Sequence, residues 1–166
     1  LRQRIGYVPQ KGVLFSGTID SNIRYGKPEA TEAEVKRAAE IAQAWEFIQD
    51  KEDGMDSAIA QGGSNVSGGQ KRRLSIARVI AKEPEIYIFD DSFSALDYKT
   101  DVVLRRALKK ETKDATTLIV AQRISTILHA DKILVLDEGK VVGQGTHKEL
   151  LKSCDVYRQI VMSQLS

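Results

Sequence analysis

The sequence predicts an α/β domain in which a helical insertion interrupts a parallel sheet. Short apolar runs of strand length recur along the chain, and segments with apolar residues at helical spacing lie between them. Strands that alternate with helices are typical of a parallel sheet. Residues 14–83 contain no such run, so we expect them to form the insertion. The runs cover residues 5–8, 86–89, 117–121 and 132–136.

The size and charge of the chain limit its class. Its 166 residues suit one domain of ordinary size. Hydrophobic residues make up 42% and charged residues 29%, which is typical of a folded domain and excludes a disordered one. The 25 Lys and Arg nearly balance the 23 Asp and Glu, for a net charge of +2. Because this charge provides no domain-wide field, we expect no nucleic-acid partner.

Cysteine content and the lengths of the apolar runs indicate the cellular setting. The single cysteine, Cys154, excludes an internal disulfide and a structural zinc site, so we expect a reducing compartment. The apolar runs are far shorter than the roughly 20 residues that span a bilayer. The chain starts at Leu1 without an initiator Met, and we expect it to be a piece of a longer protein.

Helix starts are marked by Ser or Thr three positions before Glu or Gln, the spacing of a capping box. The first helix is expected to run from Thr31 to about Gln49, and Trp45 is expected to lie in the core of the helical insertion. Pro84 ends the second helix, whose inward-facing residues are Leu74, Ala77 and Ala81. The capping pairs are Thr31 with Glu34, Ser67 with Gln70, and Thr146 with Glu149.

The C-terminal half continues the alternation of strands and helices. The runs at 86–89, 117–121 and 132–136 predict strands buried on both faces. Residues 99–113 predict a crossover helix. The turn at residues 137–140 predicts an antiparallel hairpin. The apolar positions of the crossover helix are Val103, Leu104, Ala107 and Leu108, and those of the last helix are Val156, Tyr157, Ile160 and Val161.

Three polar features follow these elements in an order that indicates phosphate chemistry. Residues 67–70 form a glycine-rich helix start, whose free N–H groups and positive dipole end suit phosphate oxygens. Asp90 and Asp91 end a strand at the position where α/β sheets bind ligands, and a carboxylate there can bind Mg²⁺. Gln122 ends another strand.

The residues and spacing of these motifs resemble those of a known family. Val66-Ser67-Gly68-Gly69-Gln70 is followed, twenty residues after it starts, by the strand at 86–91 and then at once by Ser94-Ala95-Leu96-Asp97. This constellation resembles the nucleotide-binding domain of an ABC transporter. The first motif is similar to the family's signature motif, the strand to its Walker B motif, and the last to its D-loop.

The resemblance extends over the whole chain. Residues 8–10 are similar to the Q-loop, and residues 15–26 resemble the segment that follows it in exporter-type members. Residues 121–126 match the switch region, and residues 138–150 match the usual ending. The resemblance implies a P-loop NTPase-like fold.

The family pattern also implies an organisation into core and subdomain. Residues 1–13 would supply a core strand and the start of the Q-loop. Residues 14–83 would form the helical subdomain, ending in the signature motif and its helix. Residues 84–166 would return to the core. The Walker A loop and the aromatic residue that stacks on adenine would precede Leu1, so the isolated chain is expected to be inactive.

Departures from the family pattern lie at three positions. The Walker B Asp is usually followed by Glu, which polarises the attacking water, but here Asp91 follows. Its carboxylate is withdrawn by roughly 1.5 Å. The switch position is usually His, and here it is Gln122, which cannot become cationic. Gln61 replaces a Glu that commonly contacts the coupling region in exporters.

The resemblance implies a subunit that works with ATP and Mg²⁺ in a head-to-tail dimer of two nucleotide-binding domains. Its own site would be weak, as in one half of a heterodimeric exporter, at the cytoplasmic face of the cell membrane beside a transmembrane domain. The implied roles are Mg²⁺ and water binding for Gln10 and Asp90, a poor base for Asp91, γ-phosphate contact for Gln122, contact across the dimer for Asp97, and contact with the partner's ATP for Ser67, Gly68, Gly69 and Gln70.

Two alternatives stay open at this point. One is a subunit that clamps ATP without hydrolysing it. The other is a soluble ABC ATPase that works on DNA or ribosomes. Residues 15–26 and 145–150 favour the exporter, because their wording is exporter-like.

Other polar residues need no function. His129 and His147 are expected to be structural or solvated. The basic run at residues 71–73 is expected to be a solvated helix face, because three basic residues in a near-neutral domain rarely mark a nucleic-acid site.

Overall fold

A computed structural model describes residues 1–165 of the chain. The chain divides into two compact units, Leu1–Val120 and the residues from Ala121 onward. The first contains a parallel sheet with helices, and the second contains an antiparallel hairpin with helices. Among residues 1–165, no helix is both long and apolar enough to cross a membrane.

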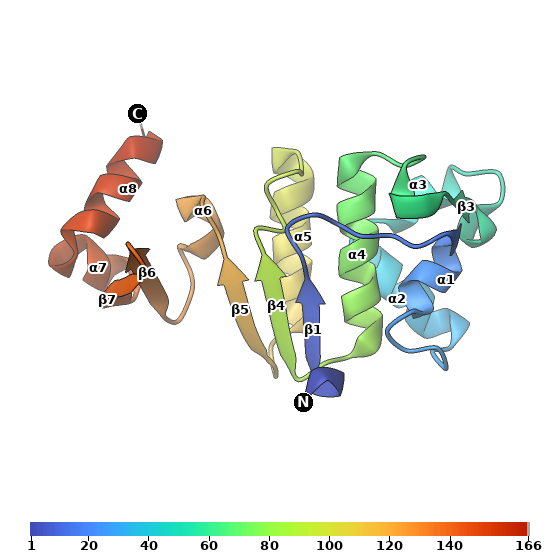
Figure 1. Ribbon diagram of the computed structural model, residues 1–166, viewed down its shortest axis with the longest axis horizontal. Coiled ribbons are helices and arrows are strands. Elements are labelled where there is room, and N and C mark those ends of the chain that lie inside the picture. The colour runs from blue at the N-terminus through green and yellow to red at the C-terminus, as the bar shows by residue number, and fades with distance from the viewer. Residues whose placement is uncertain (166) are drawn as a thin grey trace. The chain divides into compact units, whose positions relative to one another are not determined.

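The sheet of the first unit has three parallel strands in the order β1-β4-β5 (Figure 1). They are β1 (Ile5–Val8), β4 (Ile86–Asp90) and β5 (Thr116–Val120). Val8 is paired with Phe89, and Asp90 with Val120, so the carboxyl ends of the three strands meet at one edge. This confirms the predicted α/β class with a parallel sheet, and the observed strand register positions the candidate site.

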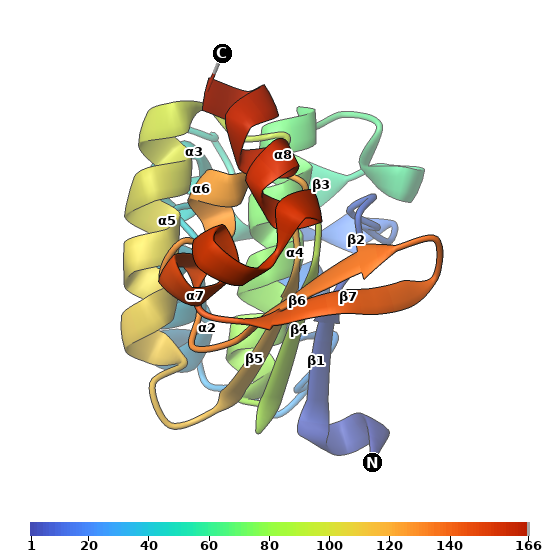
Figure 2. The same cartoon turned by 90° about the vertical axis from the view of Figure 1, so that its left-hand side faces the viewer.

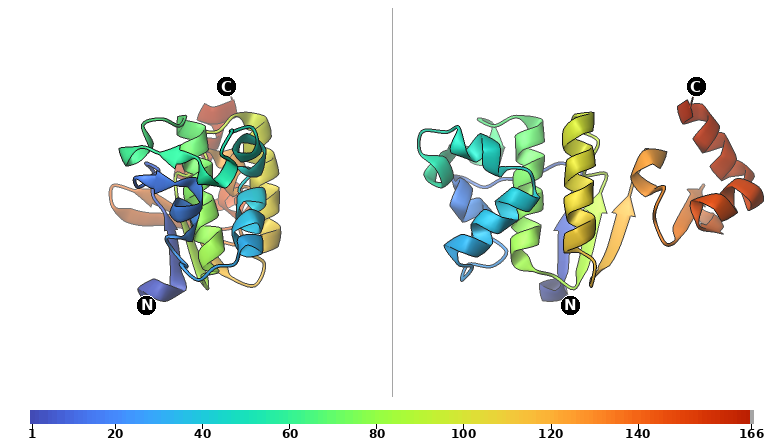
Figure 3. Two further views of the ribbon diagram at one scale, coloured as in Figure 1. Left: turned by 90° about the vertical axis from the view of Figure 1, so that its right-hand side faces the viewer. Right: turned by 180° about the vertical axis from the view of Figure 1, so that it is seen from behind.

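Two long helices pack beside this sheet. The helix α4 (Gly68–Lys82) lies beside β1, and α5 (Tyr98–Glu111) lies against one face of the sheet, as Figure 3 shows from behind. Leu104 and Leu108 of α5 are buried, as predicted. Val103 is 42% exposed, so the buried face of α5 is narrower than the apolar pattern of its sequence predicts.

The insertion between β1 and β4 is mostly helical. Contrary to the prediction, it also contains a short antiparallel strand pair. Helix α4 packs against both α1 and α2, so its apolar side chains lie in the hydrophobic core. The elements are β2 (Gly17–Thr18), α1 (Ile19–Arg24), α2 (Glu32–Ile41), α3 (Trp45–Gln49), β3 (Ala58–Ile59) and the 3₁₀ turns η2 (Gly54–Asp56) and η3 (Gln61–Gly63), with η1 (Arg2–Arg4) preceding β1.

The helix predicted from Thr31 to Gln49 is two helices. Gln43 adopts a left-handed backbone conformation with φ of 60°, which ends α2. Its side-chain amide donates to the carbonyl oxygens of Glu40 and Ile41, each at 3.2 Å, and so satisfies groups that a continuing helix would have used. The chain then restarts as α3.

Two strands are less buried than predicted. β5 is the edge strand of its sheet, and Leu118 and Val120 are each 52% exposed. The run at 132–136 forms β6 (Ile133–Asp137), which pairs with β7 (Lys140–Gly145) in an antiparallel hairpin instead of joining the parallel sheet. Only one face of that hairpin is covered, so Leu134 and Leu136 remain exposed.

The second unit has a small core of its own. Glu138 and Gly139 have φ of 48° and 76°, which gives the tight hairpin turn that the sequence predicts (Figure 2). Side chains from the hairpin meet those of the last two helices. The helices are α6 (Ile124–Ile127), α7 (His147–Ser153) and α8 (Asp155–Leu165), and the buried core residues are Ile133, Val135, Leu150, Cys154, Tyr157 and Val161.

Candidate functional site

The glycine-rich start of α4 has the predicted cap. Ser67 Oγ accepts a hydrogen bond from the Gln70 backbone N–H at 3.1 Å, and Gln70 Oε1 accepts from the Ser67 N–H at 3.2 Å. A Cβ on Gly68 would meet nothing within 4 Å, and one on Gly69 would make only ordinary contacts. Packing within this chain therefore does not require either glycine, and their N–H groups face no intrahelical acceptor.

The carboxyl end of β4 carries the two carboxylates. Asp90 Oδ2 accepts a hydrogen bond from the Tyr7 hydroxyl at 3.0 Å. Asp91 starts the turn after β4, and its N–H donates to the Val120 carbonyl at 2.8 Å. The buried hydroxyl of Ser92 donates to Val8 O at 3.1 Å. All three strand ends are thereby joined at this edge of the sheet.

Gln10 lies beside the second carboxylate. Gln10 Nε2 donates to Asp91 Oδ2 at 3.3 Å. Two of the predicted site residues, eighty-one positions apart, are thus brought together. The amide oxygen of Gln10 and the carboxylate of Asp90 are hard oxygen donors that suit Mg²⁺, which in nucleotide sites is typically held by one or two carboxylates together with substrate phosphates.

Asp97 forms the N-cap of α5. Its Oδ1 accepts from the Thr100 backbone N–H at 2.9 Å. Hydrogen bonds from the Thr100 hydroxyl and backbone, with a contribution from the nearby Arg73, hold the pKa of Asp97 below its ordinary value. The side chain is therefore charged and held in one orientation at physiological pH.

Gln122 belongs to the second unit, where its backbone is held by the last helix. Gln164 Nε2 donates to Gln122 O at 2.6 Å, and Gln164 Oε1 accepts from the Ile124 N–H at 2.8 Å. The Gln122 residue itself is exposed. No motif in the sequence marked Gln164, because its role comes from a contact over forty residues.

The expectation of a solvated basic face at residues 71–73 is wrong for Arg72. This residue is only 8% exposed, because α4 is packed by α1, α2 and β1 on several sides. Arg73 is also engaged: its guanidinium donates to Gln43 O at 2.8 Å and lies 4.8 Å from the Phe47 ring centre. These side chains were missed because their acceptors are backbone carbonyls, which leave no pattern in the sequence.

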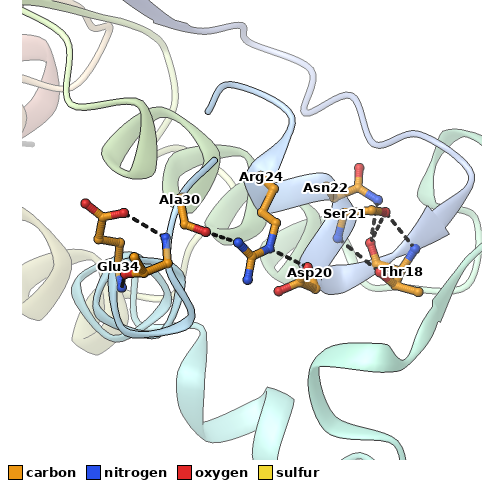
Figure 4. A network of polar contacts seen from close by, with 8 residues as sticks. Thr18, Asp20, Ser21, Asn22, Arg24, Ala30 and Glu34 are labelled. Atoms are coloured by element: carbon orange, nitrogen blue, oxygen red, sulfur yellow. Dashed lines mark hydrogen bonds and ion pairs between the residues drawn. The ribbon is translucent and has the colours of Figure 1, made fainter. Parts of the chain in front are cut away.

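The segment after the Q-loop is fixed by a polar network (Figure 4). Thr18 and Ser21 cap α1 reciprocally, and the Asn22 amide donates to the carbonyl oxygens of Phe15 and Thr18, each at 2.9 Å. Arg24 bonds Asp20 at 2.6 Å and also donates to the Ala30 carbonyl. The segment whose sequence resembles that of exporters is therefore held by a network of side-chain hydrogen bonds.

One of the two histidines of the second unit, His147, has a structural contact. His147 Nδ1 lies 2.7 Å from the Tyr157 hydroxyl, and the two rings meet edge to face. Burial raises the pKa of Tyr157. The expectation that His147 is structural is confirmed.

The comparisons with known proteins agree with this arrangement. The family model described as "ABC transporter" matches residues 1–94. An uncharacterized ABC transporter ATP-binding protein of Mycobacterium tuberculosis is 48% identical over 163 residues, which cover 96% of this chain and 28% of that protein. A putative multidrug export ATP-binding/permease protein of Staphylococcus aureus is 46% identical over 160 residues, with 96% and 28% covered.

A solved structure shows the same fold. A bacterial Atm1-family ABC exporter with ATP bound matches with a TM-score of 0.96 and 39% sequence identity, over 99% of this chain and 29% of that chain. The fold is therefore the ABC ATPase fold of the P-loop NTPase class. The chain belongs to the ABC transporter family. It spans 28% of the length of the curated relatives described above.

Proposed function

We propose that this chain is the ATP-binding and ATP-hydrolysing portion of an ABC exporter, and that its signature motif completes an ATP site on a partner domain. The observation that carries the proposal is the open, capped start of α4. Ser67 orders the first turn, while Gly68 and Gly69 leave space in front of backbone N–H groups. Such a helix start favours a phosphate supplied from outside the chain.

The chain's own site is proposed to use the residues at the carboxyl ends of β1 and β4. Gln10 and Asp90 would hold Mg²⁺ beside the phosphates, and bound Mg²⁺ would stabilise the negative charge that develops there. The contact between Gln10 and Asp91 supports a shared site. Asp91 is a poor base in this proposal, because its carboxylate stands one methylene short of a Glu.

Two further residues would complete the machinery. Gln122 would contact the γ-phosphate as a hydrogen-bond donor without moving a proton. Asp97 would act across the dimer, from the orientation that its cap on α5 provides. A weak site beside an open signature motif supports a heterodimer in which the partner has the stronger site.

The proposed assembly follows from the relatives. The name of the Staphylococcus aureus relative combines ATP-binding and permease functions, and the structural relative is an exporter. We therefore place this chain with a second nucleotide-binding domain and a transmembrane domain, at the cytoplasmic face of the cell membrane. Residues 1–13 and 84–166 would form its ATPase core, and residues 14–83 its helical subdomain.

ATPase assays on the full complex test this assignment. Ser67→Arg places bulk where the phosphate must approach and should nearly abolish activity, since one lost donor in an active site typically costs about 2.7–4 kcal/mol of barrier. Asp91→Asn should leave most activity, because the partner's site does most of the hydrolysis.

Two control variants separate phosphate contact from helix capping. Ser67→Asp keeps a strong N-cap but places a negative charge beside the phosphate, so it should also inactivate. Ser67→Thr keeps both the cap and the hydroxyl and should remain active. A larger loss from Asp91→Asn than from Ser67→Arg would mean that this chain hydrolyses ATP itself, and the asymmetric assignment would fail. Normal ATP binding without turnover in every variant would identify an ATP-clamping subunit instead.

A further inference from the structure

Arg72 is a buried cation that bonds to two backbone carbonyls. It projects from α4, is 8% exposed, and its Nη1 donates to Pro9 O at 3.2 Å and to Asp91 O at 3.4 Å. It makes none of the ion pairs found among residues 1–165. Burial lowers the pKa of Arg72, and the negative charge of Asp91 opposes that shift.

The burial of this guanidinium is not explained by packing. Removing a charge from water costs free energy that carbonyl acceptors offset only in part. An apolar side chain of similar length would fill the same space without that cost. The arginine therefore indicates a need for a cationic donor at this position.

The two carbonyls belong to the loops that carry the candidate site. Pro9 immediately precedes Gln10, and Asp91 is the first residue after β4. The side chains of Gln10 and Asp91 are themselves joined at 3.3 Å. A single nitrogen of Arg72 thus connects the helix that starts at the signature motif to both loops.

The backbone of Asp91 needs such support. Its φ is 46°, in the left-handed region, which costs a residue with a Cβ roughly 1 kcal/mol. Its N–H is held by Val120 O, and its carbonyl accepts from Arg72 and from Ser94 Oγ at 3.3 Å. Within the part of the chain that the structure describes, loss of the Arg72 donor would leave the Asp91 carbonyl with only the hydrogen bond from Ser94 Oγ.

We infer that Arg72 is a positioning residue that links the signature helix to Gln10 and Asp91 within the same chain. A displacement of the start of α4, when the signature motif meets a phosphate on the partner, would pass through Arg72 to the two loops of this chain's own site. The role of this link in transport rests on the proposed function. The hydrogen bonds that form the link are a property of this fold.

Hydrogen–deuterium exchange on the full-length protein that contains this chain tests the link without any assay of activity. Arg72→Met keeps the length of the side chain and removes its donors. We expect exchange in residues 9–13 and 91–94 to be about tenfold faster, as suits the loss of a hydrogen bond from a charged donor. Lys71→Met is the matched control, because Lys71 precedes Arg72 on α4 and donates no side-chain hydrogen bond within the described part of the chain.

Three outcomes decide the inference. Faster exchange in both loops with Arg72→Met, no change with Lys71→Met and an intermediate rate with Arg72→Lys support it. Unchanged exchange in either loop overturns it, as does an Arg72→Lys rate equal to that of Arg72→Met. If Arg72→Met does not fold, the comparison of Arg72→Lys with the unchanged protein carries the test, with about threefold faster exchange expected in both loops.

A kinetic readout then connects the link to the proposed function. In single-turnover assays of this chain's own site within the full transporter, Arg72→Met should lower the rate of hydrolysis at least fivefold and leave the apparent KM for ATP unchanged, because Arg72 touches no nucleotide in the proposed arrangement. An equal rise in KM would overturn the positioning role. A protein without ATPase activity would refute the proposed function, while the exchange result would still report on the link.

Discussion

The guanidinium of Arg78 donates hydrogen bonds to both the backbone and the side chain of Asn22. Arg78 Nε donates to Asn22 O, and Nη2 donates to Asn22 Oδ1, each at 2.9 Å. The guanidinium also lies 5.1 Å from the ring centre of Phe15 and 5.6 Å from that of Tyr25, and burial lowers its pKa. Helix α4, which starts with the signature motif, therefore also anchors the segment that follows the Q-loop.

Because Asn22 makes these contacts, we expect Asn22→Ala to lower the free energy of unfolding considerably. Asn22 is 2% exposed and also accepts from the Phe15 N–H at 2.9 Å. The substitution leaves that N–H and part of Arg78 without acceptors, so we expect the free energy of unfolding to fall by about 2–4 kcal/mol. Urea denaturation of the chain measures this change.

Asn65→Ala is the control for this prediction. Asn65 also bonds two backbone groups, Ala60 N at 2.9 Å and Ala58 O at 2.8 Å, but it is exposed. Water can replace its bonds, so its loss should cost about 1 kcal/mol or less. Equal costs for the two substitutions would contradict the argument from burial.

The isolated 166-residue chain should bind Mg-ATP poorly. In the P-loop class, a glycine-rich loop and its Lys supply most phosphate contacts, and the sequence contains no such loop. Titration calorimetry should show no saturation below about 1 mM, where binding free energy is only about −4 kcal/mol. A micromolar dissociation constant would contradict this prediction and show that Gln10, Asp90 and their neighbours suffice to bind Mg-ATP.

Restoring both altered positions should speed hydrolysis at this chain's own site. Asp91→Glu extends the carboxylate by one methylene, and Gln122→His supplies a group that can carry a proton. Since a misplacement of 1 Å can cost on the order of 100-fold, we expect a gain of about tenfold to a hundredfold in single-turnover assays of the full complex. An unchanged rate would refute the assigned roles of the two residues.

We expect the free energy of unfolding to fall at alkaline pH, where the buried Tyr87 loses its proton. Burial, with help from the charges of Glu111 and Glu83, raises the pKa of Tyr87 from 10.0 to about 12. The folded state therefore holds this proton more tightly than the unfolded state. The resulting stability is fully present below pH 10 and is lost as the pH rises towards 12.

Two phenylalanine variants check the assignment of this pH dependence. Tyr87→Phe removes the ionisable group, so its urea midpoint should fall less between pH 10 and 12 than that of the unchanged chain. Tyr98→Phe should keep the full fall, because Tyr98 is 81% exposed. Identical curves for Tyr87→Phe and the unchanged chain would exclude Tyr87 as the cause.

Local sequence patterns predicted the elements well wherever the structure depends on near neighbours. The capping boxes at Thr31, Ser67 and Thr146 are all present, because each needs only residues within one helical turn. The hairpin turn at residues 138–139 is likewise local. Motif wording also indicated the family that the comparisons then showed.

The same patterns failed where burial depends on distant partners. The alternation of strands did not reveal that β6 belongs to a separate sheet from β1, β4 and β5, or that β5 lies at an edge of its sheet. Apolar content alone cannot tell a strand covered on both faces from one covered on a single face. The break at Gln43 was missed because a left-handed glutamine is uncommon and gives no composition signal.

By itself, the sequence determined which groups are candidates for binding a phosphate or its Mg²⁺: the N–H groups of the glycines after Ser67, the carboxylates of Asp90 and Asp91, and Gln10 after Pro9. Only the tertiary structure decided how these groups are joined. Gln10 meets Asp91 because β1 and β4 are adjacent parallel strands that end together. Arg72 reaches both loops because α4 packs beside β1, and its acceptors are backbone carbonyls that every residue carries. Hydrogen bonds to such groups depend on where the chain passes and not on which residues compose it.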